Sequence, residues 1–281
     1  MKKFFFLIGC LIAGILQNSL QAQYYHKDIV SNKQALKEKN LLQELKIKKV
    51  IVHSFEGDRS ESKGFFCEKK ISKNYREIET YTKSYISGRS ILTSSYNENG
   101  MLLQSMDSSD IAVATSLYEY DAKGNIVKIT SRSHSFDEDF ATSLLEVHQY
   151  KYDDKNRPVQ MLRIRNGKDS ALIDFVQDER GNITDEIEPG INGKHFYYYY
   201  DDKNRLTDIV KFNAVKGALK PDFIFEYNRQ NQLTKMVSIE DGMSGDYYNW
   251  VYVYGDEGQR IIEKCFSKEN ILLGYFEYEY K

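Results

Sequence analysis

The chain is poor in the residues that mark several common protein classes. Its 281 residues include one Trp, three Pro and three Cys. So few Cys exclude a framework of several disulfides, and scarce Pro suits a chain that is nearly all hydrogen-bonded strand. Basic and acidic residues nearly cancel, 39 against 41, which argues against a nucleic-acid or anionic-membrane binder. The 41% of apolar residues is enough for a packed core and excludes wholesale disorder.

Familiar catalytic and metal-binding motifs are also missing. The five His lack H-x₃-H or H-E-x-x-H spacing, and no G-x-S-x-G, P-loop, G-x-G-x-x-G or C-x-x-C occurs. Acidic pairs such as Asp153-Asp154 and Asp201-Asp202 do not form the D-x-D-x-D-G pattern of a calcium loop. The sequence therefore predicts no metal site, no cofactor and no catalytic residue, and we interpret the chain as a non-enzyme.

The first 22 residues have the features of a signal peptide. Lys2 and Lys3 precede an apolar run from Phe4 to Leu16, which is too short to span a bilayer, and Ala22 is a plausible cleavage point. Cleavage there removes two Lys and no acid, leaving 37 basic and 41 acidic residues. No later apolar run approaches the ~18 residues of a membrane span, so we expect a soluble, exported protein, periplasmic or extracellular.

Cysteine allows a second interpretation of the same leader. Leu7-Ile8-Gly9-Cys10 resembles the lipobox of bacterial lipoproteins, so the alternative is a lipoprotein anchored through Cys10. After cleavage at Ala22 only Cys67 and Cys265 remain. They lie at opposite ends of the repeat array, and we expect two separate small hydrophobic residues rather than a disulfide.

Tyrosine is abundant, with 22 residues, and much of it falls in a repeated phrase. The phrase is an aromatic pair at period two, a small polar residue, two variable residues, Gly or Asn, and an aliphatic residue two positions later. Its copies are SSYNENGML (94–102), YEYDAKGNI (118–126), YKYDDKNRP (150–158), FVQDERGNI (175–183), YYYDDKNRL (198–206), FEYNRQNQL (225–233) and YVYGDEGQR (252–260).

The phrase predicts a strand, a tight turn and a returning strand. Asp or Asn opens most of the turns, which favours a type I turn. Three positions later stands a residue that readily takes left-handed backbone, and a type I turn followed by such a residue is a common β-hairpin connection with a bulge. These structural turn residues are Gly100, Gly124, Asn156, Gly181, Asn204, Asn231 and Gly258.

Other turn signals, such as Asn166-Gly167 and Asp241-Gly242, should close hairpins at the opposite edge. The array then holds roughly fourteen to sixteen strands, more than the ~10 that an open twisted sheet tolerates. We therefore predict an all-β fold, a curled antiparallel sheet of tandem β-hairpins shaped as a trough, a superhelix or a barrel-like shell. The polar stretch from Ser131 to Ser143 is predicted to be a protruding loop.

One short helix is predicted before the array. Ser31 and Gln34 match a capping box, and Leu41 and Leu45 are spaced to pair along a helix from Ser31 to Lys46. The predicted organisation is a signal peptide at 1–22, an N-terminal helical cap at 23–48, and the hairpin array at 49–281, with clear repeats over 94–281.

Y-x-Y-D-x-x-G-N-I and Y-x-Y-D-D-K-N-R-L resemble the YD repeat of Rhs-type proteins, over about two-thirds of the chain. The resemblance implies curled β-shells on extracellular or surface-associated proteins that are often described as sugar-binding. Large members enclose a C-terminal toxin domain, for which this chain leaves no room. It looks like a small, secreted, stand-alone YD-repeat protein.

The aromatic pairs have two interpretations. Structurally, they fill the inner face of the shell, which the regular spacing favours. Functionally, flat rings bind sugars, and the best candidates are Trp250 with Tyr247, Tyr248 and Tyr252. We predict a non-catalytic scaffold or binding protein of the cell envelope whose partner is a glycan or an envelope protein. The alternatives are a carbohydrate-active hydrolase and a structural accessory of a larger Rhs-type surface system.

Overall fold

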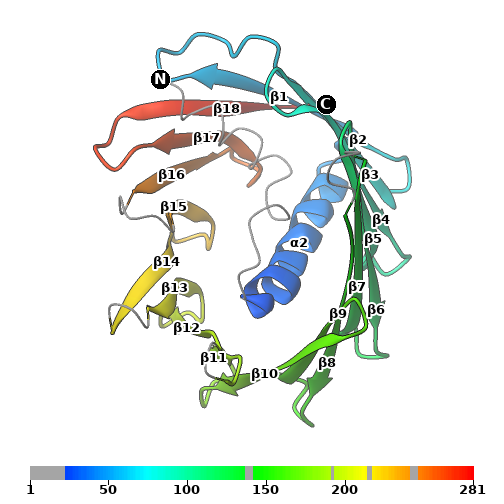
Figure 1. Cartoon of the computed structure of the whole chain (residues 1–281). Helices are drawn as coiled ribbons and strands as arrows, with labels where there is room; N and C mark the ends of the chain where they lie inside the picture. The colour runs from blue at the N-terminus through cyan, green and yellow to red at the C-terminus, as the bar shows by residue number, and fades with distance from the viewer. Residues whose placement is uncertain (1–22, 137–141, 191–192, 214–216, 241–245) are drawn as a thin grey trace. The chain divides into compact units, whose positions relative to one another are not determined.

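The structure, a computed structural model, describes residues 23–136, 142–190, 193–213, 217–240 and 246–281 (Figure 1). The predicted signal peptide and Cys10 lie outside these residues. A π-helical stretch η1 (Tyr25–Val30) leads into α2 (Ser31–Glu44), and strands make up most of the chain after α2. Within the described ranges, no helix has both the length and the apolar character needed to cross a membrane.

The described residues form eighteen strands. The first ten are β1 (Lys49–Glu56), β2 (Phe66–Ile71), β3 (Glu77–Ser84), β4 (Gly88–Tyr96), β5 (Leu102–Ser109), β6 (Ala112–Tyr120), β7 (Ile126–Ser135), β8 (Ser143–Tyr152), β9 (Pro158–Arg165) and β10 (Asp169–Gln177). The others are β11 (Ile183–Ile187), β12 (His195–Tyr200), β13 (Leu206–Asn213), β14 (Ala218–Tyr227), β15 (Leu233–Ile239), β16 (Tyr247–Tyr254), β17 (Arg260–Phe266) and β18 (Leu272–Tyr280).

The strand pairing corrects the predicted fold class. Strands β2 to β18 pair in chain order within a single 18-stranded sheet, and β1 pairs with both β2 and β18. By its pairing the sheet is therefore a closed antiparallel β-barrel, and the prediction of a curled repeat sheet was wrong. Because β1 pairs with both β2 and β18, the first strand of the chain is hydrogen-bonded to the last, whereas an open sheet would end in two unpaired edge strands.

Each repeat turn has the backbone that its residue types favour. The angle φ is positive at all seven turn residues, from +59° at Asn204 to +88° at Gly258. A register shift precedes each turn that follows β4, β6, β8, β12, β14 and β16, for example between Lys151 and Tyr152. This combination is a hairpin connection with a bulge, and it sets the pairing of the two strands that it joins.

The opening residue of a turn binds the residue four positions later. In the turn of β8 and β9, Asp153 Oδ1 accepts the backbone N–H of Arg157, and Asp153 Oδ2 accepts Arg157 Nη2 at 2.6 Å. Asp121 with Asn125, Asp178 with Asn182, and Asp201 with Arg205 repeat the arrangement. The D-x-x-G-N and D-x-x-N-R pattern is therefore a side-chain clamp on the turn.

The second aromatic of most repeats ties one hairpin to the preceding one. Its hydroxyl donates to the carbonyl of the first residue after the preceding repeat turn, at 2.8–2.9 Å. The pairs are Tyr120 with Leu102, Tyr152 with Ile126, Tyr200 with Ile183, Tyr227 with Leu206, and Tyr254 with Leu233. Much of the excess of Tyr is thus explained by one recurring hydrogen bond.

The chain divides into two compact units. Unit 1 contains residues 1–51, 64–175 and 280–281, and unit 2 contains residues 52–63 and 176–279. In unit 1, η1 and α2 pack on one face of the sheet, which we call the helix face. α2 contacts it through Glu38 with Lys69 Nζ at 2.5 Å and through Lys39 over the Tyr96 ring.

The first aromatic of the later repeats is buried, as the structural interpretation predicted. Each unit has its own apolar core. Unit 1 buries Tyr24, Ile29, Leu42, Val50, Cys67, Ile71, Ile78, Tyr96, Ile129, Tyr150, Met161, Ile173 and Phe175. Unit 2 buries Ile183, Phe196, Tyr198, Ile209, Phe225, Trp250, Tyr252, Cys265 and Phe276.

Three local predictions need correction. The helix exists, but no side chain caps α2, and Ser31 Oγ instead donates to the carbonyl of His26 because η1 continues directly into α2. The predicted loop from Ser131 to Ser143 is shorter than expected, because Ser131 to Ser135 belong to β7 and Ser143 starts β8; residues 137–141 lie outside the described ranges. The strand number was also underestimated, because strands without the repeat phrase complete the sheet.

Gly124 offers a direct test of the turn backbone. Its φ is +85°, and a Cβ there would meet only Met101 Sδ at an ordinary 3.7 Å, so a substitution is limited by the backbone rather than by space. We expect Gly124→Val to lower the free energy of unfolding by about 2 kcal/mol. Gly124→Asn should stay within about 0.5 kcal/mol of the parent in urea unfolding, because Asn occupies this position in three other copies. Equal stability of the Val and Asn variants would contradict the assignment.

The tyrosine ladder is tested by removing one hydroxyl. Tyr152→Phe keeps the ring and deletes the bond to the Ile126 carbonyl, so we expect a loss of about 0.5–1.5 kcal/mol in unfolding free energy. Tyr199→Phe, on a half-exposed ring of another repeat, is the matched control and should be nearly neutral. A loss of the same size in both variants would mean that the ladder bond is not the cause.

Candidate functional site

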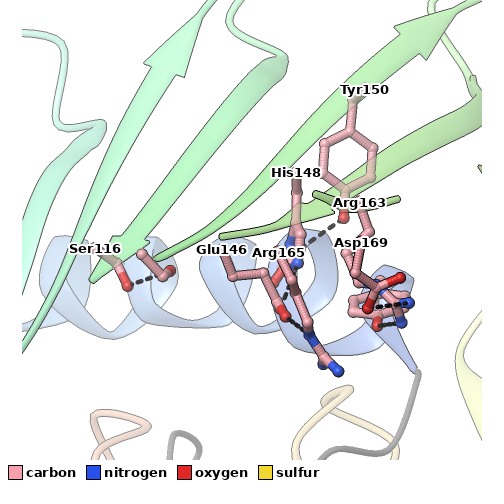
Figure 2. Close-up of polar contacts among 10 residues, drawn as sticks. Ser116, Glu146, His148, Tyr150, Arg163, Arg165 and Asp169 are labelled. Atoms are coloured by element: carbon pink, nitrogen blue, oxygen red, sulfur yellow. Dashed lines mark hydrogen bonds and ion pairs between the residues drawn. The ribbon is translucent and has the colours of Figure 1, made fainter. Parts of the chain in front are cut away.

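A cluster of charged and polar side chains lies on the helix face of unit 1, where β8 and β9 meet η1. Strand side chains alternate between faces, so Glu146, His148 and Tyr150 of β8 all point to the helix face. On the neighbouring strand β9, His148 is opposite Arg163, and Glu146 is opposite Arg165. The register therefore places three potential cations beside a carboxylate under η1 (Figure 2).

His148 is the centre of the cluster. Its Nδ1 lies 2.6 Å from Asp28 Oδ2, and its Nε2 lies 2.8 Å from Glu146 Oε1. Asp28 comes from η1, whereas Glu146 is on the same strand as His148. The imidazole is only 5% exposed, and both ring nitrogens are engaged by carboxylates.

Two further groups complete these ion pairs. Tyr150 donates its hydroxyl to Asp28 Oδ2 at 2.7 Å, the same oxygen that His148 contacts. Arg165 Nε is paired with Glu146 Oε2. The carboxylate of each acid is therefore shared between His148 and one other donor.

Arg163 connects the cluster to the start of the described chain. Its Nη1 donates to the hydroxyl of Tyr24 at 3.0 Å, and its Nη2 lies 3.8 Å from Asp169 of β10. The Tyr24 ring meets the His148 ring edge-on at a centroid distance of 4.9 Å. Tyr24 and Asp28 together fix η1 to the two strands.

The charges shift the pKa values of the cluster. Burial by itself would lower the pKa of His148, but attraction to Asp28 and hydrogen bonds with Asp28 and Glu146 outweigh it and raise the pKa to about 9. Burial favours a protonated Glu146, but its hydrogen bonds with His148 and Arg165 dominate and lower the pKa of Glu146 to about 2. At neutral pH the cluster is thus a set of paired charges around the buried His148.

This arrangement suits holding rather than catalysis. A general base needs an unprotonated nitrogen within reach of a substrate, and His148 is protonated and donates to two carboxylates. Glu146 does not match the raised pKa that a glycosidase acid requires, since the pKa of Glu146 is lowered. Among the described residues, no group of three or more His, Cys, Asp or Glu side chains is placed to hold a metal ion.

The predicted aromatic site lies on β16 of unit 2. Trp250 and Tyr252 are buried, and the indole Nε1 of Trp250 donates to Ser238 Oγ at 3.2 Å. Tyr247 and Tyr248 are partly exposed, and their side chains point to opposite faces of the strand. All four residues lie on β16, but they do not form a single exposed surface.

An exception to the repeat phrase has its own explanation. Arg260 stands where five of the other copies have Leu or Ile and one has Pro158. Its guanidinium lies 4.3 Å from the centroid of the Tyr252 ring. Its Nη1 also lies 3.0 Å from Glu263 Oε2, which accepts the Tyr278 hydroxyl as well. The positive charge of Arg260 is therefore paired with Glu263 and lies over the Tyr252 ring within unit 2.

The two cysteines are free and buried. Burial raises the pKa of the Cys265 thiol to about 12, with the charge of Glu263 as a second cause. Burial also raises the pKa of Cys67. Both thiols are therefore poor nucleophiles at neutral pH.

Sequence reasoning treated His148 as one of five scattered histidines and did not select the cluster. A signal was nevertheless present, because Glu146, His148 and Tyr150 alternate in phase with the repeat tyrosine. The basic pair Arg163 and Arg165 has the same period after the turn. Asp28 is 120 residues away from His148 in sequence, and no local pattern predicts that contact.

No protein-family model and no curated protein matches the chain. Among solved structures, a porin-like protein from Bacteroides uniformis is similar over 84% of this chain and 98% of that chain, with 8% identity and a TM-score of 0.37. One from Bacteroides vulgatus has the same coverage, 12% identity and a TM-score of 0.29.

A Tc holotoxin pore of Photorhabdus luminescens is similar over 78% of this chain but 16% of that chain, with 10% identity and a TM-score of 0.26. This chain thus spans a small part of the toxin chain. These TM-scores are low. The likeness to YD repeats stays a resemblance in sequence, with a Tc toxin among the structural neighbours.

The cluster predicts a specific pH dependence of stability. The pKa of His148 is about 9 in the folded chain and about 6.5 unfolded, so its contribution is complete below pH 6.5 and is lost as pH rises through 9. This contribution is about 3 kcal/mol. We expect the difference in urea-unfolding free energy between the parent and His148→Gln to narrow between pH 6.5 and 9.5. A constant difference over this range would mean that His148 is uncharged in the folded chain.

Proposed function

We propose that this chain is an exported, non-catalytic β-sheet protein that acts as a scaffold or binding protein of the cell envelope. The observation that carries the proposal is the pairing of charged side chains that are buried or partly buried. Asp28, Glu146, His148 and Arg165 are paired with one another and join the N-terminal segment to the sheet. They therefore serve the architecture of the chain, and export rests on the features of residues 1–22.

The sheet face opposite η1 and α2 carries the mixture of side chains expected of a surface in contact with water. On β6 and β7 this face pairs Glu119 with Lys128 at 2.8 Å, and Arg132 is exposed there. Leu117 lies among these charges. Such mixing of charged and apolar side chains is typical of a surface in contact with water, whereas lipid-facing strands carry a continuous apolar band.

A glycan or another envelope protein is the proposed partner. Half-exposed aromatic side chains offer contact area for either one, and Tyr199 and Tyr247 provide it in unit 2. Trp250 and Tyr252 are buried, so they would support the exposed rings by packing beneath them rather than contact the partner. A hydrolase would need carboxylates that can act on a substrate, whereas those of Asp28 and Glu146 are held in ion pairs.

The proposal is tested with the purified mature chain on a glycan array and as bait in an envelope-extract pull-down. We expect enrichment of a glycan class or of one envelope protein, and no release of reducing sugar from the array glycans. Tyr247→Ala should reduce binding at least tenfold if β16 makes the contact, with Tyr85→Ala, which removes an exposed ring of unit 1, as the control. No enrichment in either assay, or sugar release, would reject the proposed function.

A further inference from the structure

We propose that the sheet side of the His148 cluster is a binding site for a carboxylate group, and that Asp28 occupies it as a ligand carried by the chain itself. The inference deepens the proposed binding role by naming a chemical class of ligand, and its biological use rests on that role. The physical site can be tested independently of any natural partner.

The donors of the site converge on one oxygen. His148 Nδ1 lies 2.6 Å and the Tyr150 hydroxyl lies 2.7 Å from Asp28 Oδ2. The two donors are alternate residues of the same strand and face the same side. Charge-assisted bonds of this length are the strong kind, and the positive charge of His148 favours a carboxylate over a neutral amide.

The charge of the sheet side also fits an anion. The sheet contributes three cations, His148, Arg163 and Arg165, and the carboxylates of Glu146 and Asp169. Without Asp28 these groups carry one net positive charge around the buried side chains of His148 and Arg163, which is costly unless an anion balances it. Asp28 supplies that anion.

Aromatic rings form the apolar wall of the site. The Tyr150 ring stacks on Phe175 at a centroid distance of 6.1 Å and an interplanar angle of 8°, and Tyr24 lies edge-on to His148. The rings exclude water from the ion pairs and strengthen them. A ligand with a carboxylate on a compact body would meet the same surroundings as the Asp28 side chain.

The site does not depend on Asp28 for its shape. The pairing of β8 with β9 is set by the turn at Asp153 and Asn156, so His148 stays opposite Arg163 whatever fills the space above them. Asp28 itself lies in η1, a stretch of six residues outside the sheet. Asp28 and the side chains that bind it therefore belong to separately formed parts of unit 1. The carboxylate of Asp28 can thus be replaced by that of another molecule while the pairing of β8 and β9 is kept.

The test is rescue of a vacated site by a small carboxylate. Asp28→Ala removes the carboxylate, and we expect its thermal midpoint to fall by roughly 10 °C. Sodium formate should then raise the midpoint in a saturable way, as a ligand that binds only the folded chain does. Sodium chloride at equal ionic strength should not.

Three controls make the outcome specific. Asp28→Asn keeps the space filled, and the parent chain keeps its own carboxylate, so formate should shift neither more than chloride does. Glu44→Ala removes an exposed acid from the same N-terminal segment and should behave like the parent. If Asp28→Ala does not fold in chloride, the yield of folded protein after refolding in formate replaces the midpoint.

Formate shifts of equal size in all four proteins, or no shift and no gain in refolding yield for Asp28→Ala, would overturn the inference. Rescue together with an empty glycan array and pull-down would keep the carboxylate site and reject the proposed envelope role. Failure of rescue together with a captured partner would reject the site and keep that role.

Discussion

The structure depends on one backbone constraint, a residue in left-handed conformation three positions after each turn opener. That conformation completes the bulged hairpin turn and offsets the two strands by one residue. Because side chains alternate along a strand, the offset decides which face every residue occupies. It points the first aromatic of the repeat into the core and lets the second, as at Tyr152, reach the backbone of the preceding hairpin. In the turn between β8 and β9, a side-chain hydrogen bond from Arg157 to Asp153 stabilises the same conformation.

The phase set by these turns also builds the polar cluster. In β8 the repeat tyrosine Tyr150 lies on the helix face, so His148 and Glu146 must lie there too. After the turn, the same register brings Arg163 and Arg165 opposite them. A pattern that serves the fold elsewhere thus creates, in one hairpin, a charged surface that the N-terminal segment covers.

Local features of the sequence were predictable because they depend on neighbouring residues. The turns, the hairpins and the N-terminal helix follow from short patterns, such as the Gly or Asn at positions 124 and 156. Closure of the sheet was not predictable, because it requires β1 and β18 to pair, and the Lys49–Glu56 segment lacks the repeat phrase. The contact of Asp28 with His148 was missed for the same reason. The burial of Trp250, a predicted candidate for ligand contact, depends on packing across strands, which the local sequence does not reveal.

The use of charges where η1 meets the sheet has a physical consequence. Buried ion pairs rarely stabilise a fold more than apolar residues of similar volume would, since removing the charges from water is costly. An apolar contact would therefore hold η1 at least as firmly, but it would accept many positions of the segment. The pairing of Asp28 with both His148 and Tyr150 accepts one position and one charge state. It makes attachment of the N-terminal segment depend on a carboxylate at that point, which is the property expected of a site for an acidic group.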